Sequence, residues 1–252
     1  LSQSGFDPLS RTCRFMLTEE AHHMFVGDTG IGRIVKRTVE VMNELKTDDP
    51  VKVRAAGAID LPTIQKYMNF WFSSALDLFG SEVSSNAASY FANGLKGRPD
   101  EGHYSDHLAL GDYELELPDG KGGVKKEVVS MRNAMNEIVR NAYIRDCENG
   151  VKRWNRIIEK GGIDFTLRLP SPRFRRTVGN WANAPTDPAG NPIAPEAFAA
   201  GIKQWIPTPG DQAFVASVMQ PVLEPGKIAG WIAPPDRGIN NLPVDYEYVK
   251  VT

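Results

Sequence analysis

The 252-residue sequence has few cysteines, little net charge and no long hydrophobic run. Two cysteines, Cys13 and Cys147, are too few for a disulfide framework and suit a reducing cytosol, so we expect a cytoplasmic protein. A formal net charge of -2 argues against bulk binding to nucleic acid or to anionic membranes. No stretch reaches the roughly 18 uncharged apolar residues that a membrane helix needs. Nucleic-acid binding, membrane insertion and a secreted disulfide scaffold are therefore not indicated.

Apolar residues instead recur at helical spacing, and prolines concentrate in the last third of the chain. We predict a mainly α protein in which residues 1–165 form part of a helical bundle. Residues 166–252 are expected to be an irregular, Pro-rich extension that wraps the bundle rather than folding alone. One β-hairpin is expected near residues 113–128, where side chains alternate around the turn Asp119-Gly120-Lys121-Gly122-Gly123.

Capping residues and glycines set the expected helix boundaries. Asp7-Pro8 opens the first helix and Gly27 closes it, and Asp60 caps the third. The glycines from Gly27 to Gly32 indicate a turn between helices, because no strand precedes them and their spacing is incomplete for a phosphate loop. The remaining helices are expected at about residues 34–45, 61–79, 129–160, 195–205 and 211–219.

The stretch from Phe15 to Phe25 places carboxylates and imidazoles one helical turn apart. Residues three apart share a helix face, so Glu20 with His23, or in the alternative register Glu19 with His22, direct an oxygen and a nitrogen to one point. The face of Glu20 also carries apolar residues: Leu9, Cys13, Met16, Leu17 and Met24. We therefore expect Glu20 and His23 to point inward, where a metal ion would remove the cost of burying a carboxylate.

Glu-x-x-His pairs from two helices, with a carboxylate from each of two others, form the ligand set of di-iron bundles. The alternative for this chain is a solvated helix face. Asp77, in the third helix, and Glu82, just beyond it, are candidates to accept the second ring N–H of a metal-bound histidine. Pairing of Asp77 with an arginine, or capping of a turn, is the competing interpretation.

One local basic cluster, from Arg168 to Arg176, is a candidate for contact with substrate phosphates. The residues concerned are Arg173, Arg175 and Arg176, and a solvated loop is the alternative. A second histidine cluster, from His103 to His107, follows several glycines and a proline, so we expect a surface loop rather than a metal site.

Three segments, from Leu17 to Gly27, from Trp71 to Asn86 and from Glu224 to Pro235, together resemble one protein family. The chain is similar to the oxygenase component of benzoyl-CoA 2,3-epoxidases, which are class I di-iron enzymes of aerobic benzoate breakdown. The resemblance implies a ferritin-like bundle whose two iron ions activate O2 and place one oxygen atom across the ring of benzoyl-CoA. It also implies a separate reductase that passes electrons from NADPH through FAD and an iron-sulfur cluster.

In this family the second Glu-x-x-His typically has an acidic residue before the glutamate and an arginine before the histidine. Glu19-Glu20-Ala21-His22-His23 fits with His22 in place of the arginine, which again points to Glu20 and His23. Family members are longer, and this chain resembles their C-terminal part, so helices before Leu1 are expected to carry the other ligands. The alternative function is a non-catalytic helical module that binds an acyl-CoA or a protein partner. The sequence leaves open whether the protein is a homodimer.

Overall fold

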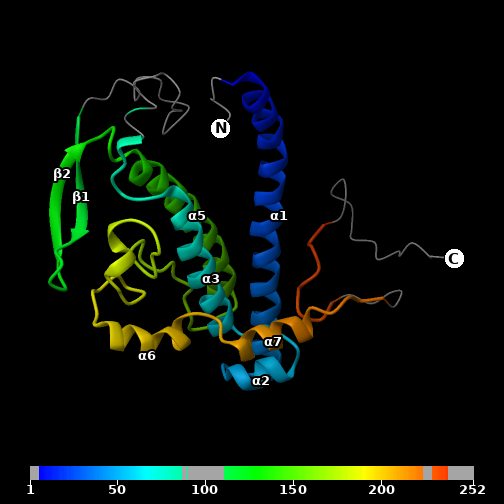
Figure 1. The fold of residues 1–252 in the computed structure, drawn as a ribbon. Helices are drawn as coiled ribbons and strands as arrows, with labels where there is room; N and C mark the ends of the chain where they lie inside the picture. The colour runs from blue at the N-terminus through cyan, green and yellow to red at the C-terminus, as the bar shows by residue number, and fades with distance from the viewer. Residues whose placement is uncertain (1–5, 87–88, 90–110, 224–228, 238–252) are drawn as a thin grey trace. The chain divides into compact units, whose positions relative to one another are not determined.

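The computed structural model describes residues 6–86, 89, 111–223 and 229–237 (Figure 1). These residues are mainly helical with one two-stranded sheet, which confirms the predicted mainly α class. The helices and strands are α1 (Asp7–Leu45), α2 (Pro50–Ala55), α3 (Leu61–Leu76), η1 (Asp77–Phe79), β1 (Asp112–Pro118), β2 (Val124–Ser130), α5 (Met135–Lys160), η3 (Asn180–Asn183), α6 (Pro195–Trp205) and α7 (Pro209–Val218).

The chain divides into two compact units that are interleaved in sequence. The first comprises Leu1–Met24, Met68–Asn149 and Leu169–Trp205, and the second comprises Phe25–Tyr67, Gly150–Arg168 and Ile206–Thr252. The predicted domains, residues 1–165 and 166–252, instead follow sequence order, and that boundary stays a prediction.

Helix α1 is a single helix of 39 residues, so the turn expected between Gly27 and Gly32 is wrong. A glycine inside a helix costs about 1 kcal/mol relative to alanine, which weakens a helix without ending it. Contacts from α5 support this part of α1: Arg153 forms an ion pair with Asp28, and the Trp154 indole N–H donates to the Asp28 carbonyl at 3.1 Å. Contacts with α5 therefore keep this part of α1 helical, although the glycines between Gly27 and Gly32 locally favour a turn.

The end of α1 follows a Schellman pattern. The Thr47 N–H donates to the Met42 carbonyl and the Lys46 N–H donates to the Asn43 carbonyl. Lys46 accordingly adopts the left-handed conformation, with φ 50°. Beyond this end, Asp49 accepts a hydrogen bond from the Val51 N–H and caps the short helix α2, which is not among the predicted helices.

In the second unit, buried side chains from α1, α2, α3 and α5 form the apolar core: Val35, Val39, Val41, Met42, Val53, Leu61 and Ile158. Asp60 caps α3 as predicted, because its Oδ1 accepts from the Thr63 N–H at 2.9 Å. Helix α7 begins with a capping box between Thr208 and Asp211, two residues earlier than expected.

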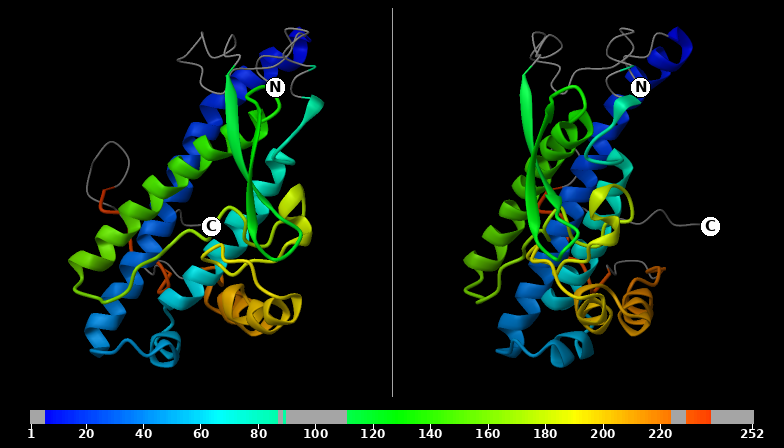
Figure 2. Two further views of the ribbon diagram at one scale, coloured as in Figure 1. Left: turned by 90° about the vertical axis from the view of Figure 1, so that its left-hand side faces the viewer. Right: turned by 60° about the vertical axis from the view of Figure 1, so that its left-hand side comes forward.

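In the first unit, β1 and β2 form a hairpin, as predicted (Figure 2). The strands are antiparallel, with Leu115 opposite Glu127. Leu115 and Leu117 point to the same side of β1 and pack on Ala134. Helix α5 begins at Met135 rather than near 129, because residues up to Ser130 pair in β2. Helix α6 has the predicted bounds, and its Trp205 lies edge-on to Phe174.

Candidate functional site

Glu20 and His23 lie on one side of α1, as the Glu-x-x-His spacing predicts. The His23 Nδ1 and Glu20 Oε1 atoms are 3.5 Å apart. Their side chains are exposed, at 57% for Glu20 and 63% for His23, and the apolar neighbours Met16 and Met24 are exposed as well. The expectation that this face points inward is therefore wrong for the chain as the structure describes it. An amphipathic pattern shows that a face needs a partner, but it does not say which segment supplies one.

The same helical turn carries the alternative register. Glu19 and His22 are also exposed, and the ring centroids of His22 and His23 are 6.5 Å apart. Within the residues that the structure describes, no three His, Cys, Asp or Glu side chains gather as a metal-binding group. Glu20 and His23 give one oxygen and one nitrogen donor, a set that suits iron. They fit part of an iron site, and the assignment of this register stays a prediction.

Asp77 lies in η1 and pairs with an arginine, the competing interpretation given above. Its Oδ1 accepts from Arg176 Nε at 2.6 Å, and its Oδ2 accepts from the backbone N–H and the hydroxyl of Thr177. Burial alone would raise the pKa of Asp77, but the hydrogen bonds from Thr177 and Arg176 outweigh it and hold the pKa below its ordinary value. The expected role beside a metal-bound histidine is untested.

Glu82 is 2% exposed and lies between two arginines. Its Oε1 accepts from Arg140 Nη1 at 3.2 Å and lies 3.7 Å from Arg176 Nη1, while its Oε2 accepts from the Asn180 N–H at 2.8 Å. A Cβ on Gly179 would come within 2.3 Å of Glu82 Oε2, so only glycine lets the backbone approach the carboxylate. Burial opposes ionisation, but the Asn180 N–H and Arg140 lower the pKa of Glu82. Its role beside a metal-bound histidine likewise stays a prediction.

The three arginines of the basic cluster have different surroundings. Arg173 pairs with Glu116 and lies over the ring of Trp181, 4.7 Å from its centroid. Arg176 is 4% exposed and pairs with Asp77, so the solvated loop considered for this cluster is wrong at Arg176. The reason is that buried carboxylates draw a guanidinium inward, which a local charge count does not reveal.

Arg175 differs from both neighbours. Its φ of 52° places it in the left-handed region, which costs a residue other than glycine about 1–2 kcal/mol. The guanidinium donates from Nη1 to the Ser74 hydroxyl at 3.0 Å and lies 4.7 Å from the centroid of the Phe70 ring. Among the described residues it has no carboxylate partner.

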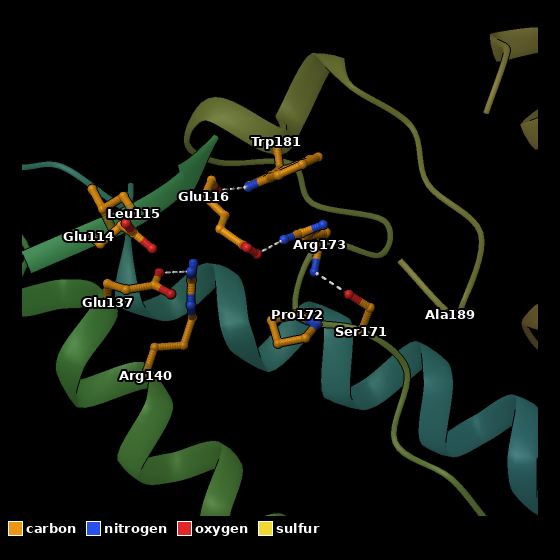
Figure 3. Close-up of a pocket in the computed structure, with 10 residues that line it drawn as sticks. All are labelled: Glu114, Leu115, Glu116, Glu137, Arg140, Ser171, Pro172, Arg173, Trp181 and Ala189. Carbon is orange, nitrogen blue, oxygen red and sulfur yellow. Dashed lines mark hydrogen bonds and ion pairs between the residues drawn. The ribbon is translucent and has the colours of Figure 1, made fainter. Parts of the chain in front are cut away.

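Next to Arg173 lies a pocket of about 540 Å³ between β1, the start of α5 and the loop before η3 (Figure 3). Its charged lining is already paired, Arg173 with Glu116 and Arg140 with Glu137. The Trp181 indole N–H donates to the Glu116 carbonyl at 3.2 Å and closes one wall. No sequence pattern linked Glu116 of β1 with Glu137 and Arg140 of α5, because the two elements are joined only by the fold. The His103 to His107 cluster lies outside the described residues.

These features define a mainly helical protein whose longest helix displays a carboxylate and an imidazole one turn apart. Within the described residues, no helix has the length and apolar character needed to span a membrane. The sequence matches no protein-family model.

The chain is 51% identical over 251 residues to a protein of Aromatoleum evansii named benzoyl-CoA oxygenase component B. The match covers 99% of this chain and 53% of the relative, so the chain spans about half the length of the curated protein it matches. This similarity confirms the resemblance inferred from the three sequence segments.

Proposed function

We propose that this chain is part of the oxygenase component of a di-iron monooxygenase that converts benzoyl-CoA to its 2,3-epoxide. The observation that carries the proposal is the 51% identity over nearly the whole chain to a protein named as a benzoyl-CoA oxygenase component. The Glu-x-x-His pair on α1 supports it independently, because carboxylate and imidazole donors at this spacing suit iron.

In this proposal Glu20 and His23 hold one iron, and a further segment supplies the other ligands. The di-iron centre supplies O2 activation when bound, with electrons from NADPH delivered by a separate flavin and iron-sulfur reductase. The role of α1 is to fix the two donors, since one helical turn sets their separation before any metal arrives.

The apolar side chains around the pair have a second role, which is to exclude water once they are covered. Phe15, Met16 and Met24 are more than half exposed in the chain as described. A helical segment packed on them would bury that surface and strengthen the interaction between the carboxylate and a cation. We expect iron to bind well only when this cover is present.

The test is iron analysis of the chain produced together with the segment that corresponds to the unmatched half of the A. evansii relative. Glu20→Ala is expected to lose iron, whereas Glu19→Ala, one residue away on the same exposed turn, is the matched control and is expected to keep it. Alanine favours the helix, so neither change should unfold α1. Equal iron content in the Glu20→Ala and unaltered proteins would remove the assignment.

The reaction itself is tested with the same preparation, a reductase and NADPH. Conversion of benzoyl-CoA to a product carrying one added oxygen atom, lost in Glu20→Ala and kept in Glu19→Ala, is the expected result. Iron binding without transfer of an oxygen atom to any aromatic thioester would contradict the proposed reaction while leaving the metal site in place.

A further inference from the structure

The loop from Arg173 to Thr177 is fastened at both ends by groups far away in the sequence. At one end Arg173 pairs with Glu116 of β1 and stacks over Trp181. At the other end Arg176 and Thr177 both bind Asp77 of η1. The residues between these two anchors therefore have a fixed backbone.

Arg175 occupies this fixed position in a left-handed conformation that glycine adopts more readily, with φ 52°. Two hydroxyls of α3, those of Ser73 and Ser74, accept from its Nη1 at 3.3 and 3.0 Å. The Phe70 ring supports one face of the guanidinium. Strain of this kind at a non-glycine residue points to a role for the side chain, because a glycine would satisfy the backbone better.

The Arg175 side chain also has hydrogen-bond donors that no described residue engages. Among the described residues, only the Nη1 atom of Arg175 forms hydrogen bonds. Arg140 and Arg176 each have one completely buried nitrogen without a hydrogen-bond partner, whereas Arg175 has no such buried nitrogen. Its Nε and Nη2 are therefore not completely buried. A guanidinium that is held rigid, lacks a carboxylate partner and presents two parallel donors matches an oxyanion such as phosphate.

We propose that Arg175 is the residue of the basic cluster that binds a phosphate group of the substrate. Arg173 and Arg176 act as positioning residues that hold the loop, because their charges are already paired. The source of the phosphate rests on the proposed function: it is the coenzyme A portion of the thioester, which carries a diphosphate and a 3′-phosphate. A free inorganic phosphate has the same chemistry and is separated from it by the test.

The test is calorimetric titration of the iron-loaded assembly with coenzyme A, 3′-dephospho-coenzyme A and inorganic phosphate. Arg175→Gln is expected to weaken coenzyme A binding by about tenfold or more, since a hydrogen-bonded charge is lost. Arg168→Gln, at the other end of the same basic stretch, is the matched control and is expected to bind as the unaltered protein does. If Arg175→Gln loses affinity for coenzyme A but not for its 3′-dephospho form, Arg175 binds the 3′-phosphate. If it loses affinity for both equally, Arg175 binds the diphosphate.

Arg175→Gly separates a loss of binding from a loss of folding, because glycine accepts the left-handed backbone without strain. It is expected to keep the thermal midpoint, because the relief of backbone strain offsets the lost contacts with Ser73, Ser74 and Phe70. It should also keep its iron content while losing the same affinity as Arg175→Gln. Unchanged coenzyme A affinity in both variants overturns the proposal, as does an unaltered protein that binds inorganic phosphate as tightly as coenzyme A. Because iron content is read separately, failure here leaves the proposed metal site standing.

Discussion

Replacing Asp211 with asparagine should remove the charge that connects α7 to α2 and α3 in the second unit. Asp211 is buried, and four donors point at its carboxylate. Oδ1 accepts from Arg54 Nη2 at 2.8 Å, and Oδ2 accepts from Lys66 Nζ at 2.9 Å and from the Thr208 N–H at 3.0 Å and hydroxyl at 2.8 Å. Burial alone would raise the pKa of Asp211, but the Thr208 N–H, Lys66 and Arg54 together hold it well below its ordinary value.

Breaking one side of a buried ion pair costs about 3–5 kcal/mol, and we expect Asp211→Asn to lie in this range near neutral pH. A carboxylate whose folded-state pKa is lowered stabilises the protein above its unfolded pKa, roughly 3.9, and loses that contribution as pH falls through the folded value. The difference in stability between the two proteins should therefore be full above about pH 5 and shrink on acidification.

Urea denaturation followed by circular dichroism from pH 7 to pH 3 measures both effects. Asp236→Asn is the matched control: its carboxylate pairs with Lys36 but its side chain is 83% exposed, so we expect a change of about 0–1 kcal/mol. If Asp211→Asn cost no more than Asp236→Asn, or if its cost stayed constant down to pH 3, the reasoning from buried hydrogen bonds would be refuted.

Three further changes test other parts of the structure. Lys46→Gly should raise the thermal midpoint, with a gain of about 0.5–1 kcal/mol, because glycine suits the left-handed end of α1; a lower midpoint would contradict this. Gly27→Ala combined with Gly30→Ala should stabilise α1 by about 1 kcal/mol per site and slow amide exchange there, since an added Cβ meets nothing within 4 Å at either site; faster exchange would refute it. Glu82→Gln should cost about 3 kcal/mol at pH 7 in a thermal melt, and the cost should fall on acidification because the pKa of Glu82 is lowered; a cost that does not depend on pH would count against the proposed ion pairs.

Features that depend on a few neighbouring residues were predicted well from the sequence. The Asp7-Pro8 start of α1, the Asp60 cap of α3 and the hairpin between β1 and β2 agree with the structure. Each is set by side chains within four or five positions, where helix and turn rules act directly. The glycines after residue 26 misled the prediction because contacts with α5, more than a hundred residues later, keep α1 helical.

In the candidate site too, local features were predicted from the sequence and long-range pairings were not. A helix alone places Glu20 beside His23, so their spacing sufficed for that prediction. The environment of Arg176 depends on Asp77 and Glu82, which lie 99 and 94 positions earlier in the chain. No periodic pattern encodes such a pairing, and only the fold shows which of the three arginines between residues 173 and 176 lacks a carboxylate partner among the described residues.

The two halves of α1 differ in how far they are buried, which bears on the proposed pair Glu20 and His23. Val35 and Val41 are buried, whereas Phe15 is 74% exposed and Met24 66% exposed, although all four belong to one continuous helix. The difference therefore arises from what packs against each half and not from the helix. In the proposed metal site, water would compete with Glu20 and His23 for a cation in exposed surroundings, and that competition would weaken once apolar groups exclude the water. Under the proposed function, we therefore expect the iron affinity to rise when a helical segment covers Phe15 and Met24, and an affinity that does not change would contradict this role of the cover.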